Sequence, residues 1–80
     1  MDEYNPHLRT LVLEVVENQI RSNDPPETKK TLHRLMQSGY SRQQAKEKIA
    51  VAVVEQIWQV MHDKKPFDEA AYTQALQSIQ

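Results

Sequence analysis

The 80-residue chain contains no cysteine and a single glycine, and each scarcity excludes a class of structure. Without cysteine, disulfide bridges, thiolate metal sites and cysteine-based catalysis are ruled out. With one glycine, there is no glycine-rich loop to hold a phosphate group. No apolar run reaches about 18 residues, and no basic segment followed by an apolar one opens the chain. We therefore expect a cytoplasmic protein without a membrane span.

Length and composition indicate one small helical domain. The chain fits a single domain, residues 1–80, near the lower limit for a sequence that folds alone. A domain of this size buries only about 60% of the surface that it exposes when unfolded, so its core is small. Glu, Gln, Lys, Leu and Ala are frequent and favour helices. We predict an all-α fold, a compact bundle of four helices with the third helix at its centre.

Capping signals divide the chain into four segments. Asn5-Pro6 places proline at the first position of a helix. Two pairs match the capping box, in which two side chains satisfy backbone N–H groups reciprocally: Asp24 with Glu27, and Ser41 with Gln44. Asp68 is a further cap residue, flanked by the predicted hydrophobic staple of Phe67 and Tyr72, and Gly39 is suited to end a helix. These signals predict helices over residues 6–22, 25–38, 42–63 and 69–79.

Apolar residues recur at spacings of three and four in the predicted helices, which indicates their inward faces. The residues predicted to face the core outside the third helix are Leu8, Leu11, Val12, Val15, Val16, Ile20, Leu32, Leu35, Met36, Tyr72, Ala75, Leu76 and Ile79. Gln19 falls among the apolar residues of the first helix, where a buried amide needs hydrogen-bond partners. We expect it to bind other parts of the fold, with a ligand contact as the alternative.

The third predicted helix has an apolar face wider than the usual stripe of an amphipathic helix. Its main face comprises Ala45, Ile49, Ala52, Val53, Ile57, Val60 and Met61, and the residues Val51, Val54 and Trp58 widen it. Such a helix is normally central, with the other helices packed around it. In the other interpretation, Val51 and Trp58 stay partly exposed and form a dimer seam or a groove for a partner protein.

Positive charge is concentrated in residues 29–48, which carry a net charge of +5 although the whole chain carries −1. The cations are Lys29, Lys30, Arg34, Arg42, Lys46 and Lys48. They lie on a helix, a turn and the start of the next helix, an arrangement that resembles a nucleic-acid-binding helix-turn-helix. Against this, the following helix is long and apolar, whereas a recognition helix offers a polar face. A solvated basic surface is the alternative.

A short stretch, "LMQSGYSRQQAKEKI", resembles the helix-loop-helix of ubiquitin-associated domains. In those domains, an apolar residue that follows the loop glycine binds a flat apolar patch, and Tyr40 takes that position here. The helix after the loop is much longer in this chain than in those domains. Local packing of Tyr40 is therefore the other interpretation.

Catalytic patterns are absent. His7, His33 and His62 lie in three different predicted helices, and none has a second histidine four residues on. The serines lie at caps and helix ends rather than at a strand-turn-helix elbow. We expect a protein that is not an enzyme and that has no catalytic residues, no cofactor and no metal.

Four segments in order, "NPHLRTLVLEVVENQI", "NDPPE", "SRQQAKEKIA" and "IWQVMHDKKPFDEAAYTQAL", are similar to a family of small bacterial proteins termed a domain of unknown function. The resemblance implies an all-helical protein without an established activity. It also implies histidines in many relatives at four positions that are Arg9, Leu13, Gln43 and Glu47 in this chain. We expect that Arg9 and Glu47 form an ion pair here in place of a metal site.

The expected function is that of a non-enzymatic interaction or structural module, which could self-associate. Binding of nucleic acid through residues 29–48 is the alternative.

Overall fold

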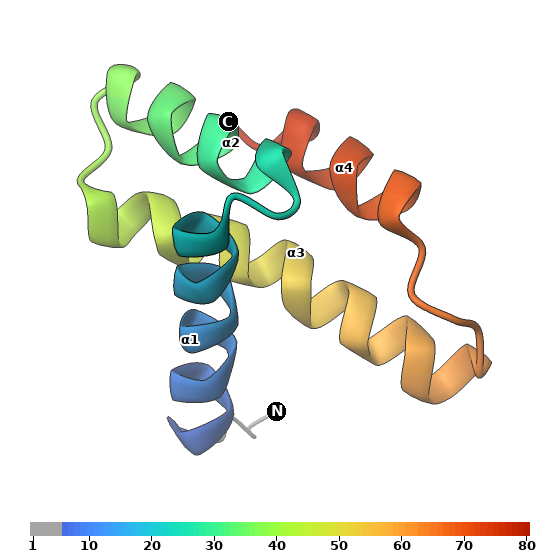
Figure 1. The fold of residues 1–80 in the computed structure, drawn as a ribbon. Helices are drawn as coiled ribbons and strands as arrows, with labels where there is room; N and C mark the ends of the chain where they lie inside the picture. The colour runs from blue at the N-terminus through green and yellow to red at the C-terminus, as the bar shows by residue number, and fades with distance from the viewer. Residues whose placement is uncertain (1–5) are drawn as a thin grey trace.

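The computed structural model describes residues 6–80, which form four α-helices (Figure 1). The helices are α1 (Pro6–Ser22), α2 (Pro26–Gln37), α3 (Arg42–Asp63) and α4 (Glu69–Ser78). The predicted bounds are right for α1 and α3 and differ by one residue at each end of α2 and at the end of α4. No strand occurs in residues 6–80. The prediction of an all-α bundle is therefore confirmed.

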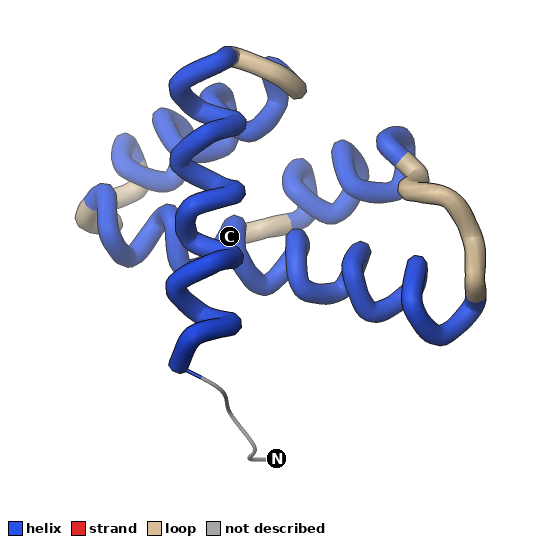
Figure 2. The backbone as a smooth tube through the Cα atoms, turned by 60° about the horizontal axis from the view of Figure 1, so that its bottom comes forward, coloured by secondary structure: helices blue, strands red, loops and turns tan. Residues whose placement is uncertain are grey.

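α3 is the central helix, as predicted, and it packs against each of the other three. Figure 1 shows α2 above the N-terminal half of α3 and α4 above the C-terminal half, with α1 crossing α3 steeply. α2 also contacts α1 and α4, whereas no Cα atom of α1 lies within 8 Å of one in α4. The loop between α3 and α4 swings out at the far end of α3 (Figure 2). The C-terminal half of α3 is thus less enclosed than its N-terminal half.

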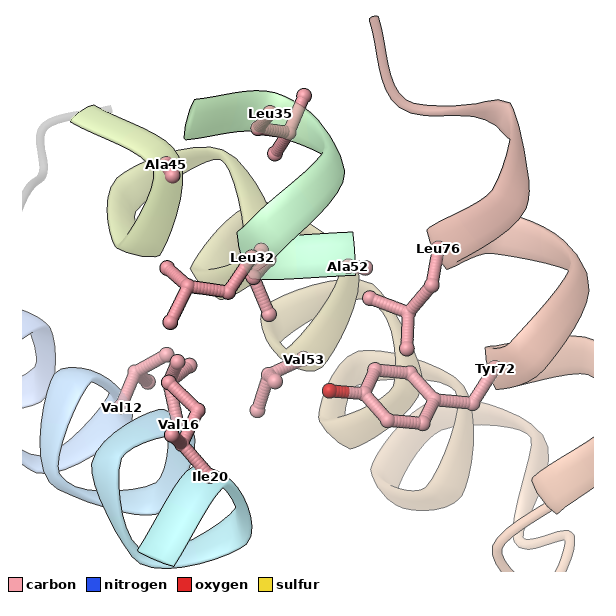
Figure 3. Close-up of a cluster of buried hydrophobic side chains, with 11 residues drawn as sticks. Val12, Val16, Ile20, Leu32, Leu35, Ala45, Ala52, Val53, Tyr72 and Leu76 are labelled. Carbon is pink, nitrogen blue, oxygen red and sulfur yellow. The ribbon is translucent and has the colours of Figure 1, made fainter. Parts of the chain in front are cut away.

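The core is a single apolar cluster to which all four helices contribute (Figure 3). Its buried members are Val12, Val16, Ile20, Leu32, Leu35, Ala45, Ile49, Ala52, Val53, Tyr72 and Leu76. Ala75 of α4 and Ile79, the residue that follows this helix, pack against the cluster and are partly buried. The helical spacing therefore identified the centre of the core correctly.

Three of the predicted helix-end signals are confirmed. The backbone N–H of Gln44 donates to Ser41 Oγ at 3.1 Å, and the N–H of Ser41 donates to Gln44 Oε1 at 2.9 Å. Asp68 Oδ1 accepts from the N–H of Ala71 at 3.1 Å. Gly39 has a φ of 107°, which side chains rarely tolerate, and the turn is closed by the N–H of Tyr40 donating to the carbonyl of Leu35 at 3.2 Å. The Asn5 signal lies outside the described residues.

The predicted staple is present as well, because the rings of Phe67 and Tyr72 lie 5.8 Å apart. The capping box predicted for Asp24 and Glu27 is wrong. Pro25 occupies the N-cap position of α2 and no side chain caps this end. Pro26, the first helical residue, lacks an N–H group, so one donor that a cap would satisfy is missing.

The predicted inward faces are too wide. Seven residues expected in the core are exposed: Leu8, Leu11, Val15, Met36, Ile57, Val60 and Met61. The physical reason is that each helix is covered along one line of contact only, and residues 6–80 contain no fifth helix that covers the rest. These exposed side chains create the candidate functional surfaces.

Candidate functional site

Exposed large apolar side chains are concentrated in one segment. Of the eleven in the described residues, seven lie between residues 51 and 67, on the C-terminal half of α3 and the loop that follows. Neighbouring large apolar side chains that stay exposed together often mark a binding surface. Two features of this region, a stripe and a groove, are the candidate sites.

The first feature is the α3 stripe, which consists of Val51, Val54, Trp58 and Met61. Their exposed fractions are 60%, 39%, 55% and 72%. The spacing of three, four and three residues aligns them along the outer side of α3, away from its buried line. The Trp58 ring stacks on the His62 ring with centroids 3.9 Å apart, which restrains the largest side chain of the stripe. From the sequence, Val51 and Trp58 could be either buried or partly exposed. Both are exposed in the structure.

The second feature is the apolar groove, a hollow of about 310 Å³ between α1, the C-terminal half of α3 and the start of α4. Its lining consists of Val15, Gln19, Val53, Gln56, Ile57, Val60, Met61, Phe67 and Tyr72. None of these nine residues carries a charge. The groove is therefore an apolar hollow whose only polar side-chain groups are two amides and one phenol.

The amide of Gln19 is a junction between three helices. Its Oε1 accepts from Thr28 Oγ1 at 2.8 Å and from the Tyr72 hydroxyl at 2.8 Å. Thr28 belongs to α2 and Tyr72 to α4, and Figure 3 shows the Tyr72 hydroxyl directed into the cluster, away from its own helix. Burial raises the pKa of Tyr72 above its usual value, and its hydrogen bonds oppose that shift only partly. The predicted structural role of Gln19 is thus present, with side chains rather than a loop backbone as partners.

Gln56 is the second amide of the groove. It is only 5% exposed, yet its side chain makes no hydrogen bond within residues 6–80. A buried amide without a partner is unfavourable, because water is lost and nothing replaces it. Gln56 was not among the predicted inward-facing residues, although its spacing from Ile49, Ala52 and Val53 indicates the inward face of α3.

The cations of residues 29–48 do not form a continuous free patch. Arg34 donates to the carbonyls of Ile79 at 2.7 Å and Leu76 at 2.9 Å, so it caps the end of α4. Arg42 and Lys46 both pair with Glu17, at 3.0 and 2.9 Å. The ammonium of Lys48 lies 4.7 Å from the centre of the Tyr40 ring. Only Lys29 and Lys30 of the six extend from the surface without such a contact in the described chain.

Glu17 of α1 is paired with two cations of α3. Hydrogen bonds from Arg42 and Lys46 hold the pKa of its carboxyl at about 2, well below the ordinary value of 4.5. The sequence analysis did not identify this pairing. Arg42 and Lys46 are four residues apart and so share one side of α3, which was the available signal.

Tyr40, a predicted partner-binding residue, is used within the fold. It is partly buried against the core, and its hydroxyl donates to the carbonyl of Gln80 at 3.2 Å. Lys48 covers its ring. These contacts agree with local packing rather than with a free recognition residue in the loop.

Arg9 and Glu47 form a salt bridge between α1 and α3, the pairing that the sequence analysis proposed. Gln43 Nε2 also donates to Glu47 at 3.3 Å. The side chains of Arg9 and Glu47 are 45% and 41% exposed, so the pair contributes about 0.2–1 kcal/mol to stability. Across residues 6–80, no group of three or more His, Asp and Glu side chains is arranged to hold a metal ion.

The fold and these surfaces define a class: a small all-α domain of four helices with an apolar stripe and an apolar groove. None of its described helices is both long enough and apolar enough to cross a membrane. The family model described as "Domain of unknown function (DUF1841)" matches residues 1–78, and the chain belongs to this family. Searches of curated proteins and of solved structures found no match.

Proposed function

We propose that the protein is a non-enzymatic interaction module that self-associates through the α3 stripe. The observation that carries this proposal is the alignment of Val51, Val54, Trp58 and Met61, all exposed, along one side of the central helix. A restrained tryptophan at the centre of an apolar stripe has the character of an interface anchor. A helix face with this spacing is suited to pack against another helix.

A second copy of the chain is the occupant that fits the stripe best, because the stripe is complementary to itself. In an antiparallel pair of α3 helices whose two-fold axis is level with residue 56, Val51 opposes Met61 of the second copy, and Val54 opposes Trp58. A two-fold interface requires this kind of reciprocal match.

Sedimentation velocity over a range of protein concentrations tests this proposal. The native chain should form a dimer as concentration rises, and Trp58→Glu should remain monomeric because it places a charge in the seam. Met36→Glu is the matched control, since Met36 is exposed on α2 but lies outside the stripe. Trp58 is the only tryptophan, so its fluorescence should shift to shorter wavelength as the native dimer forms.

A native chain that stays monomeric at several hundred micromolar would contradict the proposal, as would equal dimerisation of Trp58→Glu and the control. The alternative function has a separate test. Salt-sensitive binding of a labelled oligonucleotide that is lost in the Lys29→Ala, Lys30→Ala double variant would favour a nucleic-acid-binding protein instead.

A further inference from the structure

A second exposed apolar face lies on α1. Leu8, Leu11 and Val15 are 45%, 59% and 38% exposed. Their spacing of three and four residues places them on one side of the helix, which we call the α1 face. The buried residues Val12 and Val16 belong to the adjacent side, which meets the core. Packing within the domain therefore does not account for the α1 face.

The α1 face is joined to the α3 stripe through the apolar groove. Val15 of the α1 face and Met61 of the α3 stripe line the same hollow. The other exposed apolar residues of its lining are Ile57, Val60 and Phe67. Ten of the eleven exposed large apolar side chains in residues 6–80 therefore belong to one continuous surface, and only the one on α2 lies apart from it.

The N-terminal half of α1 reaches the side of α3 that carries the stripe. Arg9, which is next to Leu8 in the chain, forms its salt bridge with Glu47. Glu47 precedes Val51 by four residues, so it continues the line of the α3 stripe towards the start of the helix. Figure 1 shows this half of α1 extending past α3 on the side opposite α2 and α4. The α1 face and the α3 stripe are thus parts of the same side of the domain.

The α3 stripe alone is small for a stable interface. A specific interface buries about 800 Å² on each partner and involves about 20–30 residues a side. The stripe has four side chains, whereas the continuous surface that includes the α1 face has ten large apolar ones. In a two-fold dimer both copies use the same patch, so the α1 face of each copy can be covered by the other copy in return.

We propose that the α1 face is the second half of the self-association surface, and that α1 and α3 of one copy pack against α1 and α3 of a second copy. This inference rests on the proposed function, and it adds Leu8 and Leu11 to the residues that contact the second copy. The interface is then a bundle of four helices, two from each chain, which is a stable way to bury apolar helix faces.

The double variant Leu8→Gln, Leu11→Gln tests this contribution by sedimentation equilibrium. Both side chains are exposed in the single chain, and glutamine has nearly the helix propensity of leucine, so the fold should be retained. The dissociation constant of the dimer should rise at least about tenfold, because each substitution occurs on both copies. Met36→Gln is the matched control, since Met36 is exposed outside the continuous surface, and its dissociation constant should be unchanged.

Isotope-filtered NMR on an equal mixture of ¹³C-labelled and unlabelled native protein gives a readout that needs no variant. The methyl groups of Leu8 and Leu11 should show contacts with the unlabelled copy. A native dimer without these contacts, or a double variant that associates as tightly as the native chain, would overturn this inference, while loss of the dimer in Trp58→Glu would still support the α3 stripe. A native chain that stays monomeric would reject the proposed function, and this inference with it.

Discussion

The hydroxyl of Tyr72 donates a hydrogen bond of 2.8 Å to the side-chain oxygen of Gln19, and this contact joins two helices whose Cα atoms do not come within 8 Å of one another. Thr28 donates to the same oxygen from α2. A single amide oxygen of α1 therefore accepts hydrogen bonds from both α2 and α4. Because the backbone of α4 lies close only to α2 and α3, this side-chain hydrogen bond is what links α4 to α1.

Removing the Gln19 amide should cost more than removing the Tyr72 hydroxyl. Tyr72→Phe deletes one donor and leaves Gln19 paired with Thr28, so we expect a loss of about 1 kcal/mol. Gln19→Leu removes the acceptor that the Thr28 and Tyr72 hydroxyls share, and we expect a loss of about 1–3 kcal/mol. The double variant should lose less than the sum, because the two groups share one hydrogen bond. Urea unfolding measures all three; strict additivity would show that the contact is not formed in solution.

Replacing Gln56 should stabilise the protein. Gln56→Met removes a buried amide that has no partner in the described chain, and it fills the same space with an apolar side chain, so the free energy of unfolding should rise by about 1–2 kcal/mol. Gln59→Met, on the exposed side of α3, should stay within about 0.5 kcal/mol of the native value. Thermal and urea unfolding are the measurements. A destabilised Gln56→Met would mean that this amide has a structural partner.

Glu17 should make the protein sensitive to acid. Its pKa is about 2 in the folded chain and 4.5 when unperturbed, so the unfolded state takes up the proton first as pH falls. The stabilisation is therefore complete above about pH 5 and is lost as the pH falls towards 2. Because the pairs are partly exposed, we expect a contribution of about 1 kcal/mol at neutral pH.

The variant Glu17→Gln isolates this effect. The difference in unfolding free energy between the native chain and Glu17→Gln should shrink steadily between about pH 5 and pH 2, and high salt should reduce it at neutral pH. Glu14→Gln is the control, since Glu14 is an exposed carboxylate on the same helix. A difference that is constant with pH would contradict the pairing of Glu17 with Arg42 and Lys46.

Leu35 and Ile57 were both predicted from helical spacing to face the core, but they should contribute differently to stability. Leu35 is fully buried, so Leu35→Ala should cost about 2–5 kcal/mol. Ile57 is 39% exposed on the rim of the groove, so Ile57→Ala should cost about 1 kcal/mol. Urea denaturation of the two variants gives the comparison. Equal losses would indicate that the groove is closed in solution, by a second copy or by rearrangement of α4.

The sequence predicted the helices well because their ends are set locally. Gly39, the Ser41 and Gln44 pair, and Asp68 act on backbone groups within four residues, so no tertiary information is needed. The capping box predicted at Asp24 does not form, because Pro25 and Pro26 lack N–H groups and shift the start of the helix.

The candidate site was harder to predict. Helical spacing placed Val15, Ile57, Val60 and Met61 in the core, because a periodic pattern identifies a face but not how much of it other helices cover. Covering depends on where α1 and α4 lie relative to α3, which is a tertiary property. The same limit applies to Gln56. Helical spacing indicates that Gln56 lies on the inward face of α3. Whether its amide finds a hydrogen-bond partner depends on the tertiary structure and cannot be predicted from that spacing.

The uneven covering of α3 has a consequence for hydrogen exchange. Ala45, Ile49 and Ala52 in the N-terminal half of this helix are buried in the core, whereas Val60 and Met61 near its end are exposed. Amide protons of the last two turns should therefore exchange through a local opening of that end of α3 together with the loop at residues 64–68, at a small fraction of the global unfolding free energy. Amide protons of residues 45–53 should exchange only when the whole domain unfolds. The two halves of α3 would then unfold as parts of two different cooperative units, and the boundary between these units would lie at the apolar groove.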